Sequence, residues 1–544
     1  MKHSNSVHRI ENGIGTDNNP QIDRNSARSL GLFLFSITCL IVFNRLFTKG
    51  FFPPIDFYDN AFLTGTAISR FFEYNTPIAV ISSGIVILVL LYFVQKLKWE
   101  HTCGPQIRAF TLLITALVIW RNATYGYNYF FDVAFHLDRV LLIGIFILSF
   151  WRPVFLVLVL PLVFFIQGQL SINTISYSPA ELSIPIKLIA AFCTLIPFTL
   201  FLKRRFDPVF IWLATVVVMS HYWTPAYSKF LINWHEFGEI HNMLAASYAG
   251  GWLDFLDTES ISSILKNISR FDKLAMIFTL VFETAVVFAL LNRWLAILLL
   301  ILASIFHIVV FVMSGIWFWQ WLLIDLAFVY FLLIKSDKIN YESPTLPIYT
   351  RIIATILIAL SPFWMGAARL GWHDSPVSYI YQLRAVDAEN NITVLTPTYF
   401  TPYEYPFALN SLRFLSQSKT LDISWGATRD LKLVKKLTTI STKEGVLQLI
   451  ENQGLAKYDA ARARNFDFFI TEFVSNKQSR AAHKPWFDYL PAPQFLYTKL
   501  HSRQTLQMQI QRVEVHRLTS WFDGVVFQTI DDTLVRTIDI NADK

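Results

Sequence analysis

One lysine lies where an apolar run ends, and its type and position suggest chemistry more strongly than any other residue. The stretch HYWTPAYSKFLINW, from His221 to Trp234, contains Lys229. A cation beside hydrocarbon is costly unless it reaches water, pairs with a carboxylate or loses its proton. Burial would favour the neutral amine, which is a general base. Lys229 is therefore a candidate base, although a membrane-surface anchor assisted by Trp223 and Trp234 explains it equally well.

Two further ionisable residues lie inside later apolar runs. Glu283 is about ten residues into its run, where an unpaired carboxylate is expensive, so we predict a functional or helix-pairing role. His307 could exchange a hydrogen bond with Glu283 across neighbouring helices, as a structural or a catalytic pair. Four aromatic residues near Lys229 could line a cofactor pocket or form an aromatic belt. They are Tyr222, Trp223, Tyr227 and Trp234.

The composition indicates a membrane protein. Of the 544 residues, 54% are hydrophobic and only 16% are charged, and the mean hydropathy is +0.42. These values are too apolar for a soluble protein of this length, and they predict the lipid bilayer as a partner. The net charge of +7 is spread over short loops and a polar tail, so no nucleic acid partner is expected.

Apolar segments near membrane-spanning length predict a bundle of about eleven transmembrane helices. The segments are 30–47, 78–94, 110–120, 140–150, 154–166, 188–202, 208–222, 274–291, 294–313, 317–334 and 352–365. Basic residues of the short loops fall on one side in this arrangement, together with the N-terminus. This asymmetry predicts a multi-pass protein with a cytoplasmic N-terminus and Lys229 on the outer side.

The chain divides into three parts by composition. Residues 1–28 form a polar cytoplasmic tail, 29–366 form the transmembrane helical domain, and 367–544 have the composition of a globular domain. The third part contains two predicted strands at 377–386 and 392–395, two helices at 428–439 and 443–451, and alternating runs at 513–518 and 524–540. The expected fold class is therefore mainly α, a helical membrane bundle followed by an extracytoplasmic α+β domain.

Three cysteines, Cys39, Cys103 and Cys193, lie in or beside the apolar part, and the globular part has none. A disulfide framework is excluded there, which favours the periplasm and inner membrane of a bacterial cell. His235 and Glu239 have a spacing suited to a metal, but no third ligand is in register, so no metal is expected.

The residues around Lys229 resemble the HTTM family, which includes the vitamin K-dependent gamma-glutamyl carboxylases. The resemblance rests on Tyr227, Ser228, Lys229, Trp234 and Gly238, followed by Glu283, Phe306-His307, Gly315 and the aromatic residues Trp317, Phe318 and Trp319. It covers 221–331 well and places the family core at about 208–335.

The resemblance implies an enzyme that forms carbon–carbon bonds. In the carboxylases, the lysine matching Lys229 deprotonates a reduced quinone, which reacts with oxygen to give a strong base. That base removes a γ-proton from a glutamate side chain, and carbon dioxide adds to the carbanion. The implied cofactors are a vitamin K- or menaquinol-like quinol, oxygen and carbon dioxide. A peptide or protein substrate would bind at the extracytoplasmic face.

Two other classes of function remain open. Multi-span glycosyltransferases that use polyprenyl-linked sugars keep acidic residues in the first outer loop, where this chain has Asp56 and Asp59. A non-catalytic transport or assembly protein is the other class, although no internal repeat typical of transporters is visible. A metal requirement would favour the glycosyltransferase, and an inconsequential Lys229→Ala substitution would favour the non-catalytic class.

Overall fold

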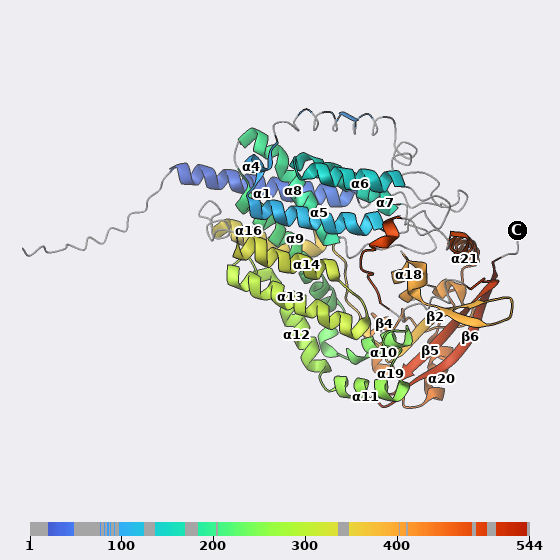
Figure 1. Ribbon diagram of the computed structural model, residues 1–544. Helices are drawn as coiled ribbons and strands as arrows, with labels where there is room; N and C mark the ends of the chain where they lie inside the picture. Colours follow the sequence, from blue (N-terminus) through green and yellow to red (C-terminus); the bar gives the residue numbers. More distant parts are fainter. Residues whose placement is uncertain are drawn as a thin grey trace, which may run out of the picture.

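The protein has a helical part followed by a smaller region built around a β-sheet. The computed structural model describes residues 20–47, 97–124, 136–168, 183–202, 205–335, 348–401, 403–409, 412–480, 486–497 and 508–540, and single positions between 77 and 92. Figure 1 shows the long helices side by side in one half of the molecule and the main sheet in the other. The prediction of a mainly helical fold with a C-terminal sheet region is confirmed.

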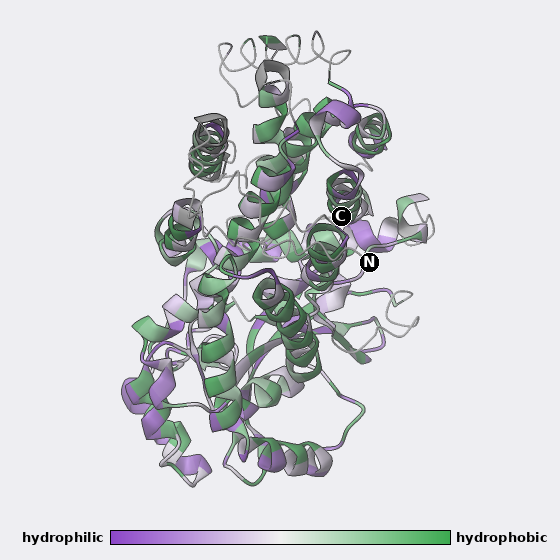
Figure 2. Cartoon of the chain, turned by 90° about the vertical axis from the view of Figure 1, so that its left-hand side faces the viewer, coloured by the Kyte–Doolittle hydropathy of each residue, from purple (hydrophilic) through white to green (hydrophobic). Residues whose placement is uncertain are grey.

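The helical part begins with α1 (Pro20–Phe47), α4 (Trp99–Thr102), α5 (Pro105–Thr124), α6 (His136–Ser149), η1 (Pro153–Phe155), α7 (Leu156–Gly168), α8 (Ser183–Leu202) and α9 (Asp207–Leu231). It continues with η3 (Trp234–Glu236), α10 (His241–Ala249), α11 (Thr258–Ser269), α12 (Asp272–Ala285), η4 (Val286–Phe288), α13 (Arg293–Ser314), α14 (Trp319–Ala327), the π-helix η5 (Phe328–Ile334), α16 (Ile348–Ala359) and α17 (Ser361–Trp364). Figure 2 shows mostly hydrophobic residues, in green, on the long helices.

Three of the described helices are long and apolar enough to span a membrane, namely α5, α9 and α13. The predicted count of about eleven is therefore too high by this criterion. Most of the predicted apolar segments do form helices, but several are short or interrupted, as where α12 passes into η4 and α14 into η5. The predicted segment 78–94 lies almost entirely outside the described residues.

Local sequence signals set the ends of α13, one of the three candidate spanning helices. The Asn292 side chain accepts a hydrogen bond from the Trp294 backbone N–H, and this satisfies one of the free donors at the helix start. Gly315 ends the helix with a φ of 71°, a left-handed conformation that glycine adopts without steric cost. A Cβ at this position would also lie 2.5 Å from the Tyr497 carbonyl oxygen, so only glycine fits.

The sheet region contains the strands β1 (His373–Asp374), β2 (Val377–Val386), β3 (Ile392–Leu395), β4 (Ala427–Thr428), β5 (Arg512–Phe522) and β6 (Phe527–Asp539). Its helices are η6 (Pro397–Phe400), α18 (Glu404–Ala408), η7 (Arg413–Leu415), α19 (Leu431–Leu437), α20 (Lys443–Gln453), α21 (Ala460–Arg480) and η8 (Trp486–Tyr489). The main sheet is antiparallel with the order β3-β2-β5-β6, and β1 pairs separately with β4.

The predicted strands β2 and β3 are confirmed at their predicted ends, and the final alternating runs form β5 and β6. The first predicted helix, 428–439, is shorter because Ala427–Thr428 pair with β1 as β4. α21 was not predicted, although Phe466, Phe469 and Phe473 follow a helical spacing and are fully buried.

Two helices of the helical part, α10 and α11, pack against the main sheet. Leu244 of α10 and Ile261 of α11 share one hydrophobic cluster with Phe522 and Phe527 of the β5–β6 hairpin. In the other direction, the Trp317 backbone N–H donates to the Phe495 carbonyl oxygen at 2.7 Å. Residues on both sides of the predicted boundary at 367 therefore pack together.

Candidate active site

Lys229 and Glu283 form a buried ion pair between two packed helices. Lys229 is in the last turn of α9, and Glu283 is in α12, which packs against α9. The Lys229 Nζ lies 2.6 Å from Glu283 Oε1 and 2.7 Å from Oε2. The two side chains are only 10% and 4% exposed. The structure thus brings together two of the predicted catalytic residues, which are 54 positions apart in the sequence.

The chain beyond α9 folds back and covers this pair. Asn233 adopts a left-handed backbone conformation with a φ of 56°, and the buried Trp234 follows it. The Trp234 ring packs in one cluster with Met276 and Leu280 of α12. Its centroid is 5.1 Å from Lys229 Nζ, within cation–π range. Trp234 therefore shields the ion pair from solvent and faces the lysine with an electron-rich ring.

A segment of the sheet region seals the end of α9. We call residues 371–373, together with Arg429, the α9 cap. A Cβ on Gly371 would lie 2.6 Å from the Ser228 carbonyl carbon, so the backbones touch. Arg429 donates to the Gly371 carbonyl oxygen at 3.1 Å and to Ser228 Oγ at 3.2 Å. His373 Nε2 lies 3.1 Å from the Ile232 carbonyl oxygen. The cap thus contacts Ser228, the residue that precedes Lys229, and fixes the end of α9.

Several acidic groups gather beyond the cap. His241 Nδ1 lies 2.6 Å from Asp272 Oδ2, and the His241 backbone N–H donates to Asp272 Oδ1. Asp374 follows the cap in β1, is 7% exposed and accepts a hydrogen bond from Trp372 Nε1 at 3.2 Å. Burial raises the pKa of Asp374 to about 8, and the nearby Asp272 carboxylate contributes in the same direction. Asp374 is therefore a protonated carboxyl group near neutral pH.

We expect Asp374 to make stability depend on pH. The pKa of this carboxyl rises from 3.8 to about 8 on folding, so the unfolded chain gives up a proton that the folded chain keeps between those pH values. Stability from this group is therefore greatest at low pH and falls as pH rises through about 8, by up to about 1.4 kcal/mol per pH unit. Thermal unfolding midpoints of wild type and Asp374→Asn at pH 5 and pH 8.5 test this. A smaller pH effect in Asp374→Asn is expected, and equal effects would contradict it.

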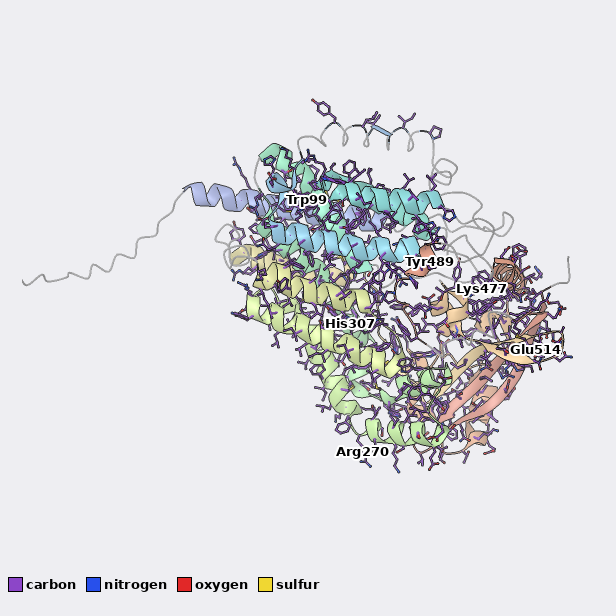
Figure 3. All side chains as sticks on the ribbon, viewed as in Figure 1. Trp99, Arg270, His307, Lys477, Tyr489 and Glu514 are labelled. Atoms are coloured by element: carbon purple, nitrogen blue, oxygen red, sulfur yellow. The ribbon has the colours of Figure 1, made fainter. Side chains whose placement is uncertain are left out.

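His307 belongs to a second buried group and not to the ion pair. Its Nε2 lies 2.8 Å from the Tyr222 hydroxyl oxygen, and that hydroxyl donates to Asp325 Oδ2 at 2.5 Å. Figure 3 labels His307 in the middle of the long helices. The hydrogen bond considered between His307 and Glu283 is thus replaced by one to Tyr222. Phe282, which precedes Glu283, contacts the Tyr222 ring at 5.9 Å between centroids and links the two groups.

The four aromatic residues predicted to line one pocket lie in three places. Tyr222 points to His307, and Trp234 covers Lys229. Trp223 Nε1 donates to the Ala359 carbonyl oxygen of α16, and the Tyr227 ring contacts Phe363 of α17. Helical periodicity explains the division, because positions 222 and 229 share one face of α9 whereas 223 and 227 share another.

Sequence reasoning missed three buried polar residues near these groups. Asp325 lies in the apolar run WLLIDLAF, and Lys187 lies in SIPIKLIAAF, where its Nζ is 3.1 Å from His221 Nε2. A charged residue type inside an apolar run was the available signal for both. Asp374 carries no such signal, because its burial results from long-range packing.

Among the described residues, no cluster of three or more His, Cys, Asp or Glu side chains is placed to bind a metal ion. Asp56 and Asp59 lie outside the described residues.

Comparisons with protein-family models, with curated proteins and with solved structures gave no match to this chain. The function is therefore argued from the buried groups themselves.

Proposed function

We propose that the protein is an integral membrane enzyme in which Lys229 accepts a proton from a lipid-soluble substrate. The observation that carries this proposal is the buried Lys229–Glu283 pair at the end of a candidate spanning helix. The pair has no net charge whether the proton is on Nζ or on a carboxylate oxygen. When the proton is on Glu283, Lys229 has a free lone pair and can act as a base.

The burial of the pair supports a chemical role over an anchoring role. A lysine that only anchors a helix reaches toward water, whereas the Lys229 residue is 8% exposed and held by two short contacts. A buried ion pair is also weak support for stability, because two apolar side chains of similar volume serve as well. Glu283 is thus the positioning residue and proton store for Lys229.

The membrane arrangement belongs to the same proposal. The shorter apolar helices, including parts of α1, α8 and α16, lie beside the long ones and would cross the bilayer with them (Figure 1). By the bias of basic loop residues, the N-terminus is cytoplasmic and the sheet region is periplasmic at a bacterial inner membrane. A peptide or protein substrate would then approach Lys229 from the periplasmic face, the side on which the α9 cap lies.

The substrate proposed for this site is a reduced quinone of the vitamin K or menaquinol type. When bound, it would supply an acidic hydroxyl group for Lys229 and reducing equivalents for oxygen, with carbon dioxide as the carboxyl donor. Trp234 offers an aromatic face close to the lysine, which suits a flat ring. Trp223 and Tyr227 are turned to α16 and α17, so only Tyr222 and Trp234 of the four predicted aromatic residues would be near it.

The test is an activity measurement on membranes that contain the full chain. With a reduced quinone, oxygen and labelled bicarbonate supplied, we expect quinone epoxide and carboxylated peptide by mass spectrometry. Lys229→Ala and Lys229→Arg should lose about 100-fold or more, the latter because a guanidinium keeps its proton at any working pH. Glu283→Gln should lower the rate and shift its pH optimum.

Lys435→Met is the matched control, because Lys435 forms an exposed ion pair with Glu236 outside the buried site. It should retain wild-type activity. Full activity in Lys229→Arg, or the absence of any quinone-dependent product from wild type, would overturn the proposal and leave Lys229 as a structural residue.

A further inference from the structure

The second buried group forms a continuous line of hydrogen bonds across three helices. His307 of α13, Tyr222 of α9 and Asp325 of α14 are 2%, 3% and 1% exposed. The Tyr222 hydroxyl lies between the other two, 2.8 Å from His307 Nε2 and 2.5 Å from Asp325 Oδ2. Both distances are short enough for proton transfer along the line.

The two outer atoms of this line have no hydrogen-bond partner among the described residues. They are His307 Nδ1 at one end and Asp325 Oδ1 at the other. A buried polar atom without a hydrogen-bond partner is unfavourable, so each end is expected to bind an oxygen-bearing group. A chain of groups that exchanges protons with its surroundings needs hydrogen bonds between its members and a free atom at each end. The three residues have both.

Proton counting gives the line two states that differ by one proton. In the first state, ionised Asp325 accepts from the Tyr222 hydroxyl, the Tyr222 oxygen accepts from His307 Nε2–H, and Nδ1 has a lone pair. When a proton binds Nδ1, the Nε2 proton moves to the Tyr222 oxygen and the Tyr222 proton moves to Asp325. The second state has a carboxylic acid, a phenol and a neutral imidazole, with the added proton on Nδ1.

The surroundings favour the second, uncharged state. The His307 ring contacts the rings of Phe318 at 5.2 Å and Trp321 at 5.4 Å between centroids, and Phe282 contacts Tyr222. An ionised carboxylate in such an apolar environment is expensive. Of the other titratable groups near the line, Lys187 is bonded to His221 and Lys229 to Glu283. Among the described residues, neither lysine forms a hydrogen bond or ion pair with Asp325 that would offset its charge.

We propose that Tyr222, His307 and Asp325 form a buried proton wire inside the helical part. It takes up a proton from an oxygen-bearing group at His307 Nδ1 and holds it as the carboxylic acid of Asp325. The oxygen belongs either to an internal water molecule or to the hydroxyl group of a lipid-soluble molecule. The wire does not require Lys229 to be a base, so Lys229→Ala should leave it intact.

The test is infrared spectroscopy of the purified full chain, which detects the C=O stretch of a protonated carboxyl group. We expect a band that is lost in Asp325→Asn and retained in Lys229→Ala. On transfer to D2O, this band should shift as the carboxyl proton exchanges. Exchange should be at least tenfold slower in Tyr222→Phe and His307→Gln, because the proton then has no route along the line.

Ser304→Ala is the matched control on α13, since Ser304 Oγ donates to the Leu300 carbonyl oxygen one turn earlier and has no other hydrogen bond among the described residues. Its band and exchange rate should equal those of wild type. Circular dichroism verifies that each variant is folded. An unchanged band in folded Asp325→Asn, or unchanged exchange in Tyr222→Phe, would overturn the wire. Exchange that persists after bound lipids are removed assigns the oxygen to water, and exchange that requires them assigns it to the lipid-soluble molecule.

Discussion

Replacing Lys229 by methionine is expected to lower the free energy of unfolding by about 3–5 kcal/mol, because Glu283 is then left buried without its partner. Replacing Glu283 by leucine should cost a similar amount for the converse reason. The double substitution Lys229→Met/Glu283→Leu should recover most of the loss, to within about 1 kcal/mol of wild type, because no charge remains to be desolvated. Unfolding by SDS in mixed micelles measures all three variants.

An exposed ion pair provides the comparison. Lys435 Nζ and Glu236 Oε2 are 3.1 Å apart, but their side chains are 49% and 43% exposed. Water and salt screen such a pair, so Lys435→Met should change the free energy of unfolding by less than about 1 kcal/mol. Equal effects of Lys229→Met and Lys435→Met would contradict the burial of the Lys229–Glu283 pair. A double variant as unstable as the single ones would contradict the electrostatic explanation.

Gly371→Ala is expected to detach the α9 cap and to lower the free energy of unfolding by about 2–3 kcal/mol. The added Cβ would lie 2.6 Å from the carbonyl carbon and Oγ of Ser228 and 2.7 Å from its carbonyl oxygen. Backbone atoms cannot move aside as a flexible side chain can, so the cap must shift away from α9. The hydrogen bonds from Arg429 to Gly371 and Ser228 would then lengthen or break.

Gly144→Ala in α6 is the matched control, because a Cβ there meets no atom within 4 Å. Alanine is the better helix former by about 0.5–1 kcal/mol, so this variant should be as stable as wild type or slightly more stable. Limited proteolysis of the segment around Gly371 provides a second measurement, with faster cleavage expected in Gly371→Ala alone. Equal stability of the two variants would contradict the close contact between the cap and α9.

Much of the secondary structure could be predicted because it depends on local patterns. Long apolar runs marked α5 to α9, α12 to α14 and α16, but not α10 and α11. The strand signals marked β2 and β3 at their observed ends and located β5 and β6, although β5 extends four residues beyond the predicted run. The number of membrane-spanning helices could not be predicted in this way. An apolar run has the same composition whether it forms one long helix or is divided, as at α12 and η4, and packing decides between these outcomes.

For the candidate site, the sequence by itself determined which residue types are out of place in an apolar environment, namely Lys229, Glu283 and His307. It did not determine their partners, because these are 54 to 85 positions away and reach them only when helices pack. Tertiary structure alone decided that Glu283 neutralises Lys229, that His307 bonds Tyr222 rather than Glu283, and that Asp374 is buried beyond the α9 cap. A charged residue in an apolar segment can be recognised from the local sequence, because burying its charge costs free energy. The group that offsets this cost comes from a distant segment, so it depends on how the helices pack.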